Sequence, residues 1–228
     1  MSRGQYAALV LAFLFCISGI ALIAISIGTD NWYHVMTAQG DATPSYHFGL
    51  WRRCYDNTIP AEIPKEDLVG LSNNCLHLEL VKAQEWLLAP SEQLRMHLLR
   101  SHVGLICTSC VLQFSTLIIL ILGLWPSGSC GCKSFRQSVV YLGTGLLSLL
   151  STIAGMAGGI CFIALRDLEE ESRDTYRKSD LRYYDWSFVL SWVSTGLCLC
   201  QSAIFLFLYR FAYDKSDYYY YSDKQYRL

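Results

Sequence analysis

The sequence predicts an all-α membrane fold in which four transmembrane helices carry a small extracellular antiparallel β-sheet. The chain has 228 residues and is 53% hydrophobic. Its charged residues avoid four windows entirely: residues 6–27, 103–125, 139–165 and 186–209. Each window exceeds the roughly 20 residues that cross about 30 Å of hydrocarbon. Because a charge at a helix centre costs about 2.5–3.5 kcal/mol on the insertion scale, we interpret all four as membrane spans of a single domain, residues 1–228.

The first span, residues 6–27, places the small residues Ala8, Ala12 and Cys16 four positions apart. Such a stripe lets a neighbouring helix approach closely, and close packing drives helix association in lipid. The sequence Ala24-Ile25-Ser26 also loosely fits a signal-peptidase site. A cleaved signal peptide is therefore an alternative, although the apolar run is longer than such signals usually are.

The first outer segment, residues 28–102, is too long to be a simple connector. Residues 31–37 are aromatic and β-branched, which predicts a strand, and residues 45–55 are interpreted as a second strand paired with it. Residues 75–81 alternate apolar and polar side chains, as a half-buried strand does. We expect these strands to form the sheet.

Two cysteines of this segment, Cys54 and Cys75, are predicted to form a disulfide. The disulfide would close a loop of about 20 residues and stabilise the fold by roughly 3 kcal/mol in the chain-entropy model. A sheet this small would otherwise be only marginally stable. Disulfides persist outside the cytosol, so this segment and residues 166–185 are expected outside, with residues 126–138, the tail 210–228 and both termini cytoplasmic. The expected location is the plasma membrane or, alternatively, the endoplasmic reticulum.

The flanks of the second and third spans are predicted to be helical. Ser91 is expected to cap a helix that begins at Glu92 and runs into the second span. The charged residues 166–185 are expected to extend the third helix by a turn or two as an ion-paired face. Within the third span, Ser151 and Gly159 belong to a small-residue stripe that indicates either tight helix contact or ordinary membrane glycine.

Three features concern the cytoplasmic side. Cys130 and Cys132 follow the second span, where cysteines are often palmitoylated. The tail 210–228 shows no periodicity and is expected to lack regular structure. Its last residues, Tyr226-Arg227-Leu228, form an apolar-x-apolar ending that can add as a strand to the groove of a PDZ scaffold.

No catalytic motif is present in the sequence, so we expect a protein that is not an enzyme and has no cofactor. Five histidines lie in the first outer segment: His34, His47, His77, His97 and His102. A zinc site is conceivable, but their spacing matches no metal motif, so isolated structural histidines are the preferred interpretation. The net charge of −1 argues against nucleic acid as a partner, and the spans lack the acidic residue typical of transporters.

Four spans, Trp32, the run Gly49-Leu50-Trp51, and the pair Cys54 and Cys75 together resemble the claudin superfamily (peripheral myelin protein, epithelial membrane protein and claudin). The resemblance covers nearly the whole chain. The run from His47 to Arg52 looks like the voltage-gated calcium channel gamma subunits.

Other motifs point to the same branches of the superfamily. Residues 28–33 and 51–54 are similar to claudin-domain-containing proteins. Tyr184, Trp186, Ser187 and Phe188 resemble the start of the fourth helix in gamma subunits. The cysteines are further apart than in tight-junction claudins, which usually end in Tyr-Val.

The resemblance implies a left-handed four-helix bundle with an extracellular sheet, one strand of which comes from near the second outer segment. It also implies that Trp32, Gly49, Leu50, Trp51 and Arg52 anchor the sheet to the helix ends. Two functions follow from it. The favoured one is an accessory subunit of a larger channel or receptor in the bilayer; the alternative is a junction protein that self-associates.

Overall fold

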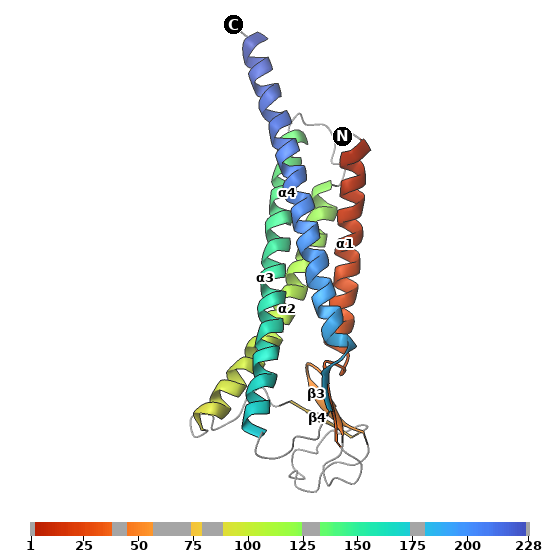
Figure 1. Cartoon of the computed structure of the whole chain (residues 1–228). Coiled ribbons are helices and arrows are strands. Elements are labelled where there is room, and N and C mark those ends of the chain that lie inside the picture. Colours follow the sequence, from red (N-terminus) through yellow and green to blue (C-terminus); the bar gives the residue numbers. More distant parts are fainter. Residues whose placement is uncertain are drawn as a thin grey trace. The chain divides into compact units, whose positions relative to one another are not determined.

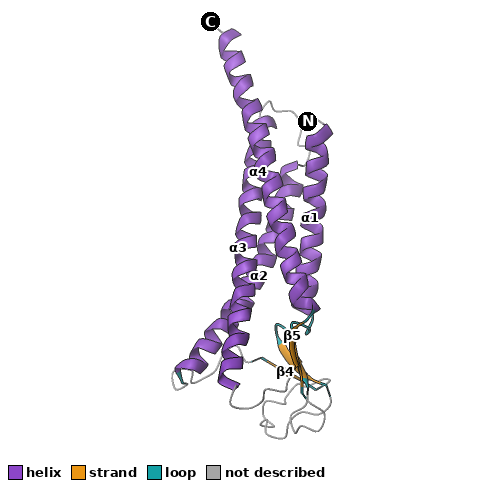
Figure 2. Cartoon of the chain, viewed as in Figure 1, coloured by secondary structure: helices purple, strands orange, loops and turns teal. Residues whose placement is uncertain are grey.

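The computed structural model describes residues 3–37, 45–56, 74–78, 89–124, 133–173 and 181–226. The described residues form four helices: α1 (Arg3–Gly28), α2 (Pro90–Leu124), α3 (Lys133–Arg173) and α4 (Trp186–Tyr226). They also form five strands: β1 (Tyr33–Met36), β2 (Tyr46–Phe48), β3 (Arg52–Tyr55), β4 (Cys75–His77) and β5 (Leu181–Tyr184). Figure 1 labels these elements, and Figure 2 separates helices from strands.

All four helices are long and apolar enough to cross a membrane, over Arg3–Gly28, Pro90–Gly123, Gln137–Glu169 and Trp186–Tyr213. The predicted fold class, a four-span membrane protein with a small antiparallel sheet, is therefore confirmed. The described residues fall into two compact units, and every helix contributes to both.

The first unit comprises residues 1–21, 108–154 and 193–228. All four helices meet in its core, which is built from Ala12 of α1, Leu120 of α2, Tyr141 of α3 and Phe205 and Leu208 of α4. Ala12 is fully buried, as its small-residue stripe predicted.

Serine hydroxyls link the helices of the first unit. Ser109 and Ser151 each donate a 2.9 Å hydrogen bond to the backbone oxygen of the other, joining α2 to α3. Ser202 of α4 bonds the Gly145 carbonyl of α3 at 2.9 Å, and Ser194 of α4 bonds a carbonyl of α1 at 2.8 Å. Such bonds contribute to helix association where no water competes.

The second unit comprises residues 22–107 and 155–192 and contains the sheet. Its strands are ordered β4-β3-β2-β1-β5, and each neighbouring pair is antiparallel. The strand β5 lies far along the chain yet pairs with β1, from Tyr33 opposite Tyr184 to Met36 opposite Leu181. The fifth strand expected from the resemblance is therefore present.

Residues 45–55 were predicted as one strand, which is wrong. They form two strands, β2 and β3, joined by a tight turn in which the Gly49 N–H bonds the Arg52 carbonyl at 2.7 Å. A continuous alternating pattern does not reveal such a turn, because its residues are themselves apolar and buried or half-exposed.

The stripe of small residues in α3 makes the close helix contacts that the sequence left undecided. In the first unit Ser151 is fully buried against α2. In the second unit a Cβ added at Gly159 would lie 2.9 Å from Cζ2 of Trp192 in α4. Both positions therefore favour small residues because a neighbouring helix lies against them.

Three helix ends differ from, or refine, the sequence prediction. Helix α2 begins at Pro90 rather than Glu92, and Pro suits the first helical position because it needs no N–H there. Helix α3 extends to Arg173, as expected. The tail 210–228 was expected to be irregular, but α4 continues to Tyr226. Extending an existing helix carries no nucleation cost. A segment without apolar periodicity can therefore be helical when it continues a helix.

Candidate functional site

The carboxyl end of α1 is capped by side chains from the segment that follows it. A helix leaves its last four carbonyls without intrahelical partners. Here Thr29 Oγ1 donates to the Ile25 carbonyl at 2.8 Å. The indole N–H of Trp32 donates to Ser26 O at 2.7 Å, and the indole N–H of Trp51 donates to Ile27 O at 3.0 Å. Two tryptophans, Trp32 and Trp51, thus tie the segment that carries the sheet to the end of α1.

Trp32 is also the centre of an aromatic cluster in the second unit. Its side chain is fully buried and meets His102 of α2, Phe162 of α3 and Phe188 of α4 edge-on, with ring centroids 4.9, 5.3 and 6.0 Å away. Edge-to-face geometry is the favourable one for such rings. One residue therefore connects all four helices.

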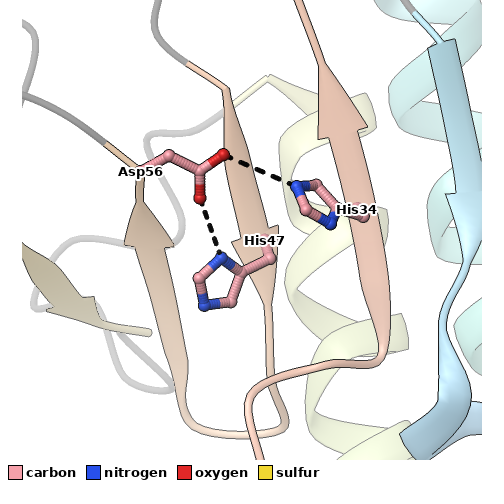
Figure 3. A group of neighbouring side chains, drawn as sticks. All are labelled: His34, His47 and Asp56. Carbon is pink, nitrogen blue, oxygen red and sulfur yellow. Dashed lines mark ion pairs between the residues drawn. The ribbon is translucent and has the colours of Figure 1, made fainter.

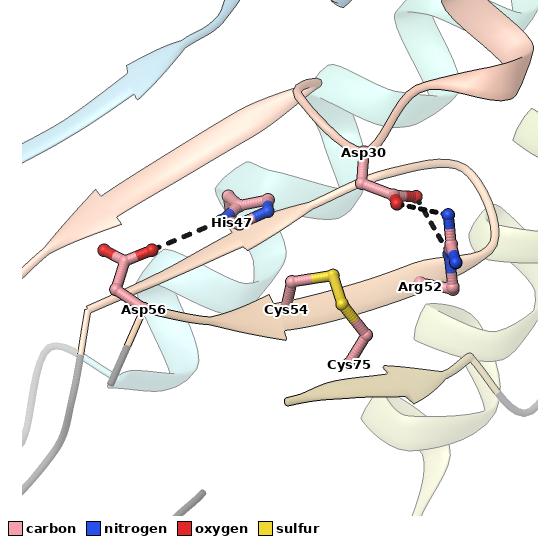
Figure 4. The surroundings of a disulfide bond; sticks show 6 residues. All are labelled: Asp30, His47, Arg52, Cys54, Asp56 and Cys75. Atoms are coloured by element: carbon pink, nitrogen blue, oxygen red, sulfur yellow. Dashed lines mark hydrogen bonds and ion pairs between the residues drawn. A yellow bond between two sulfur atoms is a disulfide. The ribbon is translucent and has the colours of Figure 1, made fainter. Parts of the chain in front are cut away.

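The turn between β2 and β3 lies against the backbone that leaves α1. A Cβ added at Gly49 would lie 2.6 Å from the Cα of Asp30, so only glycine fits. The next residue, Leu50, is buried. Arg52 Nη2 then pairs with Asp30 Oδ2 at 2.6 Å (Figure 4). The Gly-Leu-Trp-Arg run is thus a docking turn for the sheet.

The predicted disulfide joins Cys54 of β3 to Cys75 of β4 (Figure 4). The two residues stand directly opposite each other in the β3–β4 register. Both strands are short, with four residues in β3 and three in β4. The disulfide therefore adds a covalent link that holds β4 on the sheet.

The start of α4 is fixed by the residues that the sequence singled out. Asp185 accepts the Trp186 N–H through Oδ1 at 2.7 Å, which caps the helix. Ser187 is fully buried, and its carbonyl accepts the Ser26 hydroxyl of α1 at 2.7 Å. Phe188 stacks on Tyr184, with centroids 4.6 Å apart. The contacts of Ser187 and Phe188 align α4 with α1 and β5. The side chain of Trp186 is 43% exposed and takes no part in them.

A buried cation lies on the inner face of the sheet, which sequence reasoning did not identify. Arg166 of α3 is 6% exposed, and its guanidinium carbon lies 4.3 Å from the Phe48 ring centroid. Arg166 Nη1 pairs with Glu169 Oε2 at 2.8 Å, and Glu169 also pairs with Arg95 of α2 at 3.3 Å. Arg53 of β3 lies over Phe48 as well, at 4.3 Å. The guanidinium of Arg166 therefore faces the sheet, and Glu169 is its ion-pair partner.

The outer face of the sheet brings together three side chains that sequence reasoning separated. His34 and His47 are cross-strand partners, and Asp56 lies 3.6 Å from His34 Nε2 and 3.4 Å from His47 Nδ1 (Figure 3). These three residues offer ligand atoms that all lie within 4.8 Å of one another. The prediction that the histidines are isolated is wrong for this pair, because strand register, not sequence spacing, makes them neighbours.

Four of the predicted site residues lie outside the described part of the chain: Cys130, Cys132, Arg227 and Leu228. Tyr226 is the last residue of α4. The palmitoylation and PDZ interpretations therefore stay predictions.

Comparison with known proteins agrees with this geometry. The family model described as PMP-22/EMP/MP20/Claudin tight junction matches residues 17–207. The chain is 23% identical over 226 residues to the voltage-dependent calcium channel gamma-5 subunit of Homo sapiens, covering 95% of this chain and 75% of that protein.

The gamma-5 subunits of Mus musculus and Rattus norvegicus are each 21% identical over 225 residues, with the same coverage. The matched region contains α2, α3, the five strands and part of both α1 and α4. The chain is therefore a multi-pass membrane protein of the PMP-22/EMP/MP20/claudin family.

Proposed function

We propose that this chain is a non-catalytic accessory subunit of a larger channel or receptor. The observation that carries the proposal is the similarity to gamma-5 subunits, which extends over 95% of this chain. Those relatives are by name subunits of a voltage-dependent calcium channel. A partner of the same kind, an integral membrane protein larger than this chain, is the proposed target.

The proposed topology places the sheet outside the plasma membrane and both termini in the cytoplasm. The Cys54–Cys75 disulfide supports it, because such bonds persist in oxidising compartments. In this topology Cys130 and Cys132 face the cytoplasm, where they are the proposed palmitoylation sites. The ending Tyr226-Arg227-Leu228 also faces the cytoplasm and is the proposed PDZ ligand. A Cys130/Cys132 double substitution that leaves acyl labelling unchanged, or a Leu228 deletion that leaves scaffold binding unchanged, would refute these two assignments.

An exposed apolar pair on the outer face of the sheet is the proposed contact with the partner. Met36 and Leu181 are cross-strand neighbours and are 41% and 63% exposed. Exposed apolar side chains on a small sheet, outside the lipid-facing helices, are typical of interaction surfaces. A partner that covers this pair would remove both side chains from water.

Native electrophoresis of solubilised membranes tests the proposal. An accessory subunit migrates in a complex much larger than the 25.8 kDa chain. A Met36→Ser/Leu181→Ser variant should shift it to lower mass, whereas Leu94→Ser, which alters a half-exposed leucine on α2, should not. A wild-type chain that runs alone or as a multiple of itself contradicts the proposal.

The second candidate is a junction protein that self-associates. The tight-junction description of the matching family favours it. Among the described strands, β4 and β5 are the outer ones, and the edge of an outer strand can pair with another copy. Localisation separates the two functions. Enrichment at cell–cell contacts and transfer of adhesion to non-adherent cells support the junction function, whereas diffuse surface staining supports the accessory function.

A further inference from the structure

We propose that His34, His47 and Asp56 form a binding site for a divalent transition-metal ion of the zinc class on the outer face of the sheet. Two imidazoles with one carboxylate are the donor set that such ions prefer, whereas Ca²⁺ and Mg²⁺ prefer oxygen ligands alone. The site is independent of the proposed accessory function.

The register of the sheet creates the site. His34 of β1 stands directly opposite His47 of β2, so both side chains point to one face, and their ring centroids are 5.8 Å apart. Asp56 follows β3 immediately, and its N–H bonds the Ser45 carbonyl of the neighbouring chain segment at 3.0 Å. Figure 3 shows the carboxylate of Asp56 directed at both imidazoles.

The spacing of the ligand atoms suits a tetrahedral ion. Ligands bound to zinc at about 2.0–2.1 Å lie roughly 3.3–3.4 Å apart at the corners of a tetrahedron. Asp56 Oδ2 lies 3.6 Å from His34 Nε2, and Asp56 Oδ1 lies 3.4 Å from His47 Nδ1. All ligand atoms of the three residues lie within 4.8 Å of one another, so small side-chain rotations would bring them to these corners. Three protein ligands would leave the fourth position to water, as in open zinc sites.

The cluster is not satisfied by its own hydrogen bonds. The two separations exceed the usual 2.7–3.2 Å of N–H···O bonds. His34 Nε2 is buried and makes no hydrogen bond within the described part of the chain. A buried polar atom without a hydrogen bond costs free energy, and a metal ion in reach of this nitrogen would remove that cost.

Tyr183 of β5 supplies the outer contact that metal-binding histidines use. It is the cross-strand partner of His34 on the other side, and its hydroxyl lies 3.1 Å from His34 Nδ1. When Nδ1–H donates to the Tyr183 oxygen, the lone pair of Nε2 faces Asp56 and is free to bind metal. Such a second contact fixes the tautomer and orientation of the ligand.

The supporting strands hold the ligands in place. His34 and His47 lie on β1 and β2, and each of these strands has a neighbour on both sides in the order β4-β3-β2-β1-β5. His47 also stands opposite Cys54, which the disulfide ties to β4. A site built on paired strands needs little rearrangement to bind.

Zinc titration of the full-length protein in mild detergent tests the proposal. The protein is purified with an affinity tag that contains no histidine, so that the tag does not bind zinc. After chelator treatment, competition against a chromogenic zinc chelator should give one zinc per wild-type chain and a rise in melting temperature. The His34→Ala/His47→Ala variant should lose this binding. The His77→Ala/His97→Ala variant removes two exposed histidines elsewhere and should bind as the wild type does.

Two single substitutions keep the test decisive if the double variant misfolds. Asp56→Asn removes the anionic ligand with little change of shape and should weaken zinc binding. Tyr183→Phe removes the hydroxyl that contacts His34 and should weaken zinc binding by about tenfold or more. Retention of the Cys54–Cys75 disulfide reports folding in each variant. Wild-type protein that binds no zinc, or variants of this cluster that bind as the wild type does, overturns the proposal.

Discussion

The indole N–H of Trp32 donates a 2.7 Å hydrogen bond to the carbonyl oxygen of Ser26 in the last turn of α1. The same ring fills the space between α2, α3 and α4. Trp32 thus combines a polar role, capping a helix, with an apolar one, filling a junction. Its position therefore makes Trp32 a contact point for all four helices.

Replacement of Trp32 separates the two roles. Trp32→Ala should destabilise the protein by about 3–5 kcal/mol, the usual cost of deleting a buried aromatic ring. Trp32→Phe keeps most of the ring but loses the N–H and should cost less, about 1–3 kcal/mol for the unpaired carbonyl. Unfolding in detergent measures both. Trp186→Ala, at a 43% exposed tryptophan, is the control and should change little.

Gly49→Ala should destabilise the docking turn, because the new methyl group would lie 2.6 Å from the Cα of Asp30. Overpacking of this kind costs about 1–3 kcal/mol and would displace the ion pair of Asp30 with Arg52. A lower melting temperature and lower surface expression are the expected results. Gly196→Ala is the control, because an added Cβ at this glycine of α4 has nothing within 4 Å, and it should leave the melting temperature unchanged. Equal melting temperatures of the two variants would contradict the close packing of Gly49 against Asp30.

Loss of the disulfide should weaken the sheet. Cys54→Ala/Cys75→Ala should cost about 2–5 kcal/mol, seen as faster proteolysis of the outer segment on intact cells. Cys200→Ala removes an exposed free cysteine of α4 and is the matched control. If the double variant resisted proteolysis as well as the wild type does, the strands would hold together without the disulfide.

The buried ion pair predicts a non-additive double substitution. Glu169→Gln leaves the buried guanidinium of Arg166 without its 2.8 Å partner and should cost about 3–5 kcal/mol. Replacing both residues by Met removes both charges and should cost less than the two single changes together. Glu92→Gln, at an exposed partner of Arg95, should cost less than about 1 kcal/mol. Additive energies would show that the pair is not coupled.

The helices and the disulfide were predictable because each rests on a local or compositional signal. A window without charge predicts a membrane span by itself, and Cys54 and Cys75 were the two cysteines of one outer segment. Helix α4 ran further than expected, to Tyr226, since propagation follows an existing helix whatever the periodicity of its continuation.

The contacts across the sheet were not predictable, because they depend on register. A shift of one residue moves a side chain to the opposite face, so the pairing of His34 with His47 follows only once β1 and β2 are aligned. The burial of Arg166 under Phe48 likewise needs α3 and β2 to meet. The sequence placed that arginine on a charged, solvated helix face.

Purification of the tagged chain from its native membranes in mild detergent, with quantitative mass spectrometry of the proteins that stay bound, tests the accessory function most directly. We predict one larger channel or receptor in fixed stoichiometry with this chain, lost from the Met36→Ser/Leu181→Ser variant and retained by Leu94→Ser. Recovery of this chain alone, or with cytoplasmic scaffolds only, would contradict the accessory function and favour self-association at junctions.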